Sequence, residues 1–129
     1  MSTLSVAARF NNIALIEDFI YTTQDIAHNK RIKALIIATE IFDNICEHAV
    51  LLDNTDVEIT ASHRFSPYLR FTYRSKNFKN LLQALKSTEP HFDDRAQRYR
   101  GFGLRMTKNL ARKVKYRKFF SYSRITVYL

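Results

Sequence analysis

The chain has 129 residues, of which 46% are hydrophobic and 26% charged, a balance typical of one soluble globular domain with its own core. No apolar run reaches the roughly 18–20 residues that a membrane span requires, and the N-terminus lacks the basic start and long apolar centre of a secretory signal. The single cysteine, Cys46, excludes an internal disulfide, so we expect a cytoplasmic protein without membrane partners.

The net charge of +9 is unevenly distributed along the chain. Residues 1–94 carry 10 Lys and Arg against 12 Asp and Glu, whereas residues 95–129 carry 11 Lys and Arg and no acidic residue. This asymmetry favours an anionic partner for the C-terminal third, such as a nucleic acid, a nucleotide or an acidic protein surface. The alternative is a basic surface that is merely solvated.

The apolar pattern of the first half predicts one strand and two helices. Residues 3–8 alternate weakly, as in a short strand, and apolar residues at helical spacing predict helices over about 13–27 and 31–52. The second helix is apolar on most of its sides, which is typical of a central helix buried against a sheet.

The second half of the chain predicts a further set of elements. In chain order they are two strands of a hairpin, a short helix, a long polar loop, another helix and two closing strands, over residues 57–62, 68–74, 81–85, 87–100, 104–111, 114–120 and 124–129. This order predicts an α+β fold in one domain spanning 1–129. We expect a two-layer α/β sandwich, with helices on one face of a mixed, mostly antiparallel sheet.

The chain contains only two glycines, Gly101 and Gly103, where average usage predicts about nine. Glycine tolerates positive φ and allows the backbone to approach a ligand closely. Both glycines directly precede a helical pattern, and the N-terminus of a helix is a ready phosphate site. Their placement indicates that this segment holds an anionic group.

A polar stripe crosses the second predicted helix. Glu40 and Asn44 are four residues apart and therefore share one face, and His48 follows one turn later. A carboxylate there could orient or deprotonate an attacking hydroxyl, and an amide oxygen is a hard ligand suited to Mg²⁺. Together with the glycine pair, this stripe predicts a Mg·nucleotide site. The alternative is that Glu40 and Asn44 are polar positions at a groove, and His48 is more typical of a structural residue.

These segments resemble motifs of a known family. Residues 40–49, Glu-Ile-Phe-Asp-Asn-Ile-Cys-Glu-His-Ala, resemble the N-box of the GHKL (Bergerat-fold) ATPases, in the form found in bacterial anti-sigma-factor serine/threonine-protein kinases. Residues 100–111 resemble the second glycine box with its following helix, and residues 114–129 resemble the closing hairpin. The resemblance extends over essentially the whole chain and implies the histidine-kinase-like ATPase fold.

The resemblance implies an ATP-binding regulator whose cofactors are ATP and Mg²⁺. Glu40 would be the catalytic base and Asn44 the Mg²⁺ ligand. Further nucleotide contacts are expected from Arg100, Gly101, Phe102, Gly103, Leu104 and Thr126. Related proteins hold a sigma factor and phosphorylate a serine of a small antagonist protein, usually as homodimers. The same partners, and a homodimer, are therefore expected here.

The first glycine box departs from the family pattern. The family has Asp-x-Gly, whose aspartate accepts a hydrogen bond from the adenine amino group, whereas residues 73–78 are Tyr-Arg-Ser-Lys-Asn-Phe. A hydrogen bond to a charged group is worth about 1.5–3 kcal/mol, so its loss would weaken nucleotide binding about 10–100-fold. Ser75 and Asn77 are acceptors that could substitute in part, and Arg74 and Lys76 could instead favour phosphate.

Two other functions compete with this interpretation. One is a nucleotide-free pseudokinase that only binds proteins, as the missing aspartate suggests. The other is a nucleic-acid-binding domain whose basic and aromatic residues track a backbone, although no zinc finger, RNP-like motif or clear helix-turn-helix accompanies them. These residues are Arg95, Arg98, Tyr99, Arg100, Phe102, Arg105, Lys108, Arg112, Lys113, Lys115, Tyr116, Arg117 and Lys118.

Overall fold

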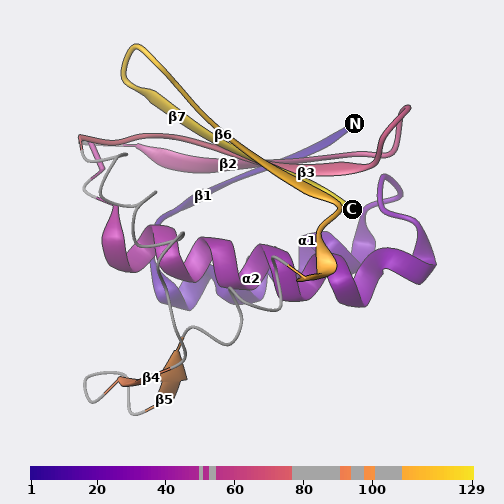
Figure 1. Cartoon of the computed structure of the whole chain (residues 1–129), viewed down its shortest axis with the longest axis horizontal. Helices are drawn as coiled ribbons and strands as arrows, with labels where there is room; N and C mark the ends of the chain where they lie inside the picture. The colour runs from indigo at the N-terminus through magenta and orange to yellow at the C-terminus, as the bar shows by residue number, and fades with distance from the viewer. Residues whose placement is uncertain (50, 53–54, 77–90, 94–97, 101–108) are drawn as a thin grey trace.

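The computed structural model describes residues 1–49, 51–52, 55–76, 91–93, 98–100 and 109–129. In these residues the chain forms an α+β structure of two layers, in which a sheet lies over a pair of helices (Figure 1). The elements are β1 (Ser2–Ala7), η1 (Phe10–Asn12), α1 (Ile13–Thr22), η2 (His28–Lys30), α2 (Arg31–His48), β2 (Asp56–Ser62), β3 (Tyr68–Arg74), β4 (His91–Asp93), β5 (Arg98–Arg100), β6 (Lys113–Phe119) and β7 (Tyr122–Tyr128).

The main sheet has five strands in the order β1-β2-β3-β7-β6. Every pairing of these strands is antiparallel, so in the described residues the sheet is antiparallel throughout rather than mixed. Each strand begins and ends within about two residues of its predicted bounds. The predicted fold class, α+β with helices on one face of the sheet, is confirmed.

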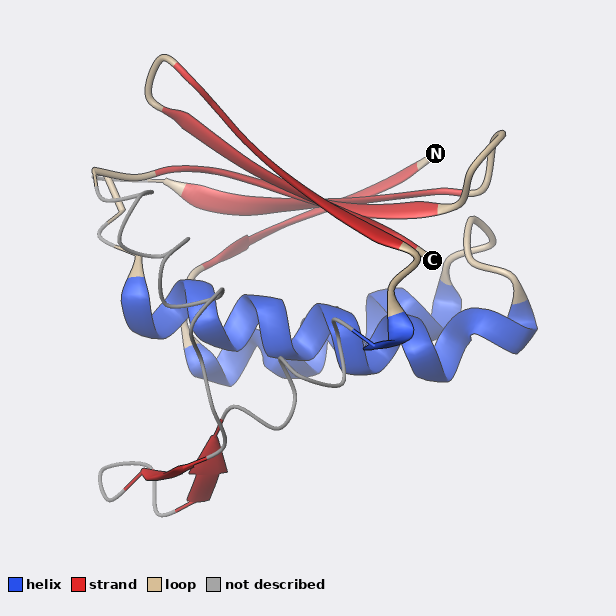
Figure 2. Cartoon of the chain, viewed as in Figure 1, coloured by secondary structure: helices blue, strands red, loops and turns tan. Residues whose placement is uncertain are grey.

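One face of the sheet is apolar and buried. Leu69, Phe71 and Tyr73 of β3 are at most 1% exposed, as are Ile125 and Val127 of β7. Because successive strand side chains point to opposite faces, these alternate residues form an inner face, which packs against α1 and α2 (Figure 2). The strand residues between them form an outer face, on which no helix of the described residues lies.

The first helix, α1, ends at Thr22 rather than at Ala27, where the apolar pattern predicted its end. Thr23 takes an extended conformation, with φ −66° and ψ 140°. The guanidinium of Arg31 binds the main-chain carbonyls at this end of the helix. These tertiary hydrogen bonds therefore end the helix at Thr22, although the apolar spacing continues to about Ala27.

The second helix, α2, ends at His48 rather than at Leu52. Leu51 forms an isolated antiparallel bridge with Ser75, and the N–H of Leu52 donates to the carbonyl of Arg74 at 3.1 Å. The chain after α2 is therefore drawn into pairing with the end of β3. This connection brings the C-terminal end of α2 close to the end of β3.

Three other predicted elements lie between β3 and β6. The segment 87–100, predicted as a loop, contains the short antiparallel strands β4 and β5. The predicted helix over 81–85 lies outside the described residues. Of the predicted helix over 104–111, the described residues Asn109 and Leu110 are helical.

The helices that the structure describes are short or interrupted by polar residues. Within the described ranges, none is long and apolar enough to cross a membrane.

Candidate functional site

Glu40 and Asn44 share one face of α2, as their spacing predicted, and there they form a hydrogen-bonded pair. The amide nitrogen Nδ2 of Asn44 donates to the main-chain carbonyl of Glu40 at 2.7 Å and to its carboxylate Oε1 at 3.2 Å. Asn44 is only 5% exposed, whereas Glu40 is partly exposed. Because an amide nitrogen can only donate hydrogen bonds, Oδ1 is the Asn44 atom suited to a hard cation, beside a carboxylate held by the same amide.

Two other polar residues of α2 complete this end of the helix. Burial, reinforced by the neighbouring charge of Asp43, raises the pKa of the Cys46 thiol to about 12. Cys46 is therefore a neutral thiol at physiological pH and a poor nucleophile. His48 occupies the last position of α2 and is half-buried. In the part of the chain that the structure describes, no three His, Cys, Asp or Glu side chains cluster as a metal site.

Ser75 lies on the inner face of the sheet, immediately after β3. Its Oγ is 3.3 Å from the Oγ of Ser123 on β7, and both residues are almost completely buried. Sequence reasoning singled out Ser75 and missed Ser123. The signal for Ser123 was its period-two spacing with the apolar residues Ile125 and Val127, which places all three on the inner face.

Tyr73 precedes this serine pair on the same face of β3. It is 1% exposed, and its hydroxyl has no hydrogen-bond partner among the described residues. Burial raises the pKa of Tyr73, so its hydroxyl stays protonated and is available as a donor. A buried hydroxyl without a partner costs about 1–3 kcal/mol, so a ligand that satisfied it would recover that free energy.

Thr126 does not join these residues. It lies on the outer face of the sheet, where Nε of Arg70 donates to its Oγ1 at 3.2 Å. Its neighbours Ile125 and Val127 are completely buried on the inner face. The sheet therefore separates Thr126 from Glu40 and Asn44, and the expectation that all three line one site is not met in this structure.

The remaining predicted nucleotide contacts are Asn77, Gly101, Phe102, Gly103 and Leu104, which lie outside the described residues. Arg100 ends β5, opposite His91 of β4. The structure therefore brings together Glu40 with Asn44, and Ser75 with Ser123. It also places the second pair at the end of β3, to which the chain returns after α2.

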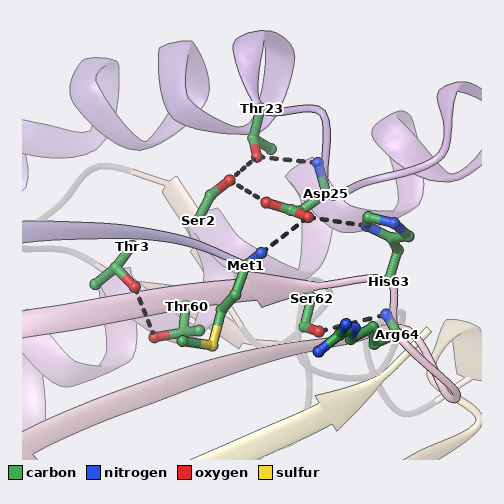
Figure 3. Close-up of polar contacts among 9 residues, drawn as sticks. All are labelled: Met1, Ser2, Thr3, Thr23, Asp25, Thr60, Ser62, His63 and Arg64. Carbon is green, nitrogen blue, oxygen red and sulfur yellow. Dashed lines mark hydrogen bonds and ion pairs between the residues drawn. The ribbon is translucent and has the colours of Figure 1, made fainter.

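A second polar cluster joins the start of β1 to the α1–α2 loop and the β2–β3 turn (Figure 3). Asp25 accepts hydrogen bonds from the hydroxyl of Ser2 and from the N-terminal amine at 3.2 Å, and it lies 2.8 Å from Nδ1 of His63. The Ser2 hydroxyl in turn accepts from Oγ1 of Thr23 at 2.6 Å. These contacts connect three separate segments through one carboxylate.

The contacts of Asp25 predict a loss of stability in acid. Its hydrogen bond from Ser2, aided by the N-terminal amine and His63, lowers the pKa of Asp25 below its ordinary value of 3.8. A lowered pKa stabilises the fold at pH values above 3.8, and this stabilisation is lost as the pH falls through the lowered value. We expect Asp25→Asn to melt below the wild type at neutral pH, and this difference to shrink below pH 3.8, in thermal melts followed by circular dichroism.

The control for this prediction is Asp18→Asn, at an exposed position of α1. Its melting temperature should follow the wild type at every pH, because a surface substitution of this kind usually changes stability by less than about 0.5 kcal/mol. A constant difference between Asp25→Asn and the wild type across the acid range would contradict the ionic role given to Asp25.

Comparisons with known proteins leave the family open. No protein-family model matches the chain, and a search of curated proteins finds no match.

Proposed function

We propose that this chain binds Mg·ATP at α2 and acts in the cytoplasm as a regulator similar to the anti-sigma-factor serine/threonine-protein kinases. Its partners would be a sigma factor, a small antagonist protein, or both, and it would act as a homodimer. The observation that carries the proposal is the pair of Glu40 and Asn44, hydrogen-bonded to each other within a helix whose other buried residues are mostly apolar.

The oxygen atoms of this pair fit the chemistry of Mg²⁺. Asn44 would hold the ion through Oδ1, the amide atom with available lone pairs, and the hydrogen bonds from its nitrogen to Glu40 would orient that oxygen. When bound, Mg²⁺ neutralises charge on the phosphates of the nucleotide. A cation with few protein ligands and several waters suits a helix that offers one amide oxygen and one neighbouring carboxylate.

The inner-face hydroxyls supply polar groups for the rest of the nucleotide. Tyr73, Ser75 and Ser123 are buried side by side at one end of β3 and β7, and the Tyr73 hydroxyl lacks a partner among the described residues. Hydroxyls can both donate and accept, as recognition of a purine edge requires. They would take over part of the role of the family's missing aspartate.

Glu40 would act on the protein partner. Its carboxylate, oriented by the amide of Asn44, would accept the proton of a serine hydroxyl as that oxygen attacks the terminal phosphorus of ATP; the bond from that phosphorus to the bridging oxygen would break, and ADP would leave with that oxygen. Removing this proton acceptor should slow transfer without abolishing nucleotide binding.

Calorimetric titration with Mg·ATP and Mg·ADP tests the proposal. We expect saturable binding by the wild type, at least tenfold weaker binding by Asn44→Ala, and near-normal binding by Glu40→Gln. The matched control is Glu17→Gln, the same change at an exposed position of α1, which should bind as the wild type. Each variant is first melted to show that it is folded.

Two results would count against the proposed function. Absence of binding by the folded wild type up to millimolar nucleotide would show that the altered first glycine box has disabled the site. Equal affinity of the wild type and Asn44→Ala would place any nucleotide elsewhere.

A further inference from the structure

The outer face of the sheet is rich in cations over three neighbouring strands. Its positions on β3, β7 and β6 include six basic side chains: Arg70, Arg74, Lys113, Lys115, Arg117 and Arg124. These three strands contain no acidic residue. Among the described residues, no acidic side chain forms an ion pair with any of the six. The acidic outer-face residues Asp56 and Glu58 lie on β2 and border this surface on one side.

Aromatic rings alternate with these cations on the same face. Arg70 lies 4.6 Å from the ring centre of Tyr68, and Arg124 lies 4.9 Å from that of Phe119. Two longer contacts, of 5.7 and 5.6 Å, join Arg74 to Tyr122 and Lys115 to Tyr128. Phe119 and Tyr122 also stack, with their ring centres 5.8 Å apart. The surface therefore presents planar groups, both rings and guanidiniums, held in place by cation–π contacts.

A hollow of about 380 Å³ opens at one end of this surface. It is lined by Arg112, Lys113, Lys115 and Tyr128, together with Ser66 of the β2–β3 turn. Three cations and one aromatic ring around a hollow of this size suit a phosphate and the base attached to it.

We propose that this outer face of β3, β7 and β6 binds single-stranded nucleic acid. The six cations would contact phosphates, and the tyrosines and guanidiniums would stack with unpaired bases, since both kinds of plane serve this role. In a duplex the faces of the bases are stacked on one another and cannot contact these rings. An acidic protein surface would pair with the cations but has no unpaired bases to stack on the tyrosines and guanidiniums. A homodimer formed through this face would be opposed by charge repulsion, because six cations of one copy would face six of the other. This inference does not depend on nucleotide binding at α2, which lies beneath the opposite face.

Fluorescence anisotropy with labelled oligonucleotides of about 12 residues tests the proposal, a length within the range covered by known single-strand modules. RNA, DNA of the same sequence, and the corresponding duplex are titrated with the wild-type chain between about 50 and 200 mM salt. We expect tighter binding of the single strands than of the duplex. Each phosphate contact contributes about −0.7 to the slope of log K against log salt concentration. If all six cations contact phosphates, the slope should therefore be about −4 and no steeper. The RNA and DNA titrations show which sugar is preferred.

Two matched pairs of variants localise the binding. Arg117→Glu and Lys118→Glu reverse adjacent exposed charges of β6, but only Arg117 lies on the outer face. Arg117→Glu should weaken binding about tenfold and make the salt slope shallower by about 0.7, whereas Lys118→Glu should change affinity less than twofold. Tyr122→Ala should weaken binding at least fivefold, whereas Tyr21→Ala, at a similarly exposed tyrosine of α1, should leave it unchanged.

Several outcomes would overturn the proposal. They are equal losses for Arg117→Glu and Lys118→Glu, no loss for Tyr122→Ala, or absence of binding by the folded wild type. Equal or tighter binding to the duplex, to polyglutamate or to anionic phospholipid vesicles would show that the face binds anionic surfaces without reading bases. Asn44→Ala should bind the oligonucleotide as the wild type does, which separates this site from the one proposed at α2.

Discussion

Replacing Phe42 by alanine is expected to lower the free energy of unfolding by about 3–5 kcal/mol. The side chain of Phe42 is completely buried in the core between α2 and the sheet. Its truncation removes apolar contacts and leaves a cavity that the surrounding side chains fill only in part. Because domains are stable by only about 5–15 kcal/mol, this loss should be visible as a large shift in a urea unfolding curve followed by circular dichroism.

Two further variants give this prediction its controls. Phe42→Leu keeps most of the apolar volume and should cost less than the alanine variant. Phe65→Ala makes the same change at a fully exposed position of the β2–β3 turn and should alter stability by less than about 0.5 kcal/mol. Alanine, like phenylalanine, has a Cβ, so the positive φ of 58° at Phe65 remains equally costly in the variant. A loss below about 1 kcal/mol for Phe42→Ala would contradict the burial of this side chain in the core.

The Phe42 prediction also bears on the candidate site. Phe42 lies between Glu40 and Asn44 in the sequence, and its burial fixes the rotation of α2 about its axis. If nucleotide binds at Glu40 and Asn44, its presence should shift the unfolding curve of Phe42→Leu towards that of the wild type, because a ligand that binds only the folded state stabilises it.

Removing the guanidinium of Arg31 is expected to cost about 2–3 kcal/mol. Nη1 of Arg31 donates to the carbonyls of Ile20 at 2.6 Å and Tyr21 at 2.8 Å, and Nη2 donates to that of Thr23 at 2.9 Å. These carbonyls end α1, where the helix itself supplies no donors and carries partial negative charge. Arg31→Ala would leave them to water or without partners, which thermal unfolding should register as a lower melting temperature.

The lysine variant separates charge from geometry. Arg31→Lys keeps the positive charge near the end of α1 but lacks the planar group that binds three carbonyls at once. We expect it to recover less than half of the stability lost by Arg31→Ala. Arg9→Ala, at an exposed position after β1, should melt as the wild type does. Full recovery by lysine would show that charge at the helix terminus alone explains the effect.

Apolar periodicity predicted the order and type of α1, α2 and the five strands of the main sheet, because that pattern reflects which side chains are buried between the two layers. It did not predict β4 and β5, which lie in a polar segment expected to be a loop. The pattern overestimated the lengths of α1 and α2, because the ends of these helices are determined by contacts with residues outside each helix. The guanidinium of Arg31 ends α1, and pairing of Leu51 with Ser75 draws the chain out of α2. Neither contact leaves a local trace in the sequence.

The candidate site was predictable only where spacing alone determines geometry. A separation of four residues on a helix places Glu40 beside Asn44 whatever surrounds them. On a strand, one residue decides between opposite faces, so a residue matched by type can point away from the site. Thr126 therefore lies on the outer face, while Ser123, which no motif marked, lies on the inner one.

Among the described residues, the strand order leaves the main sheet two unequal edges, β1 and β6. An edge strand exposes unpaired main-chain donors and acceptors that can recruit another strand, and charged side chains, lysine above all, oppose this. β6 carries Lys113, Lys115, Arg117 and Lys118, whereas β1 carries no charged side chain. Any strand that extends this sheet is therefore expected to join at β1. A polyanion that neutralised the cations of β6 would remove the charge that protects this edge. The edge at β6 would then also be open to pairing with a strand of another molecule, and so to aggregation.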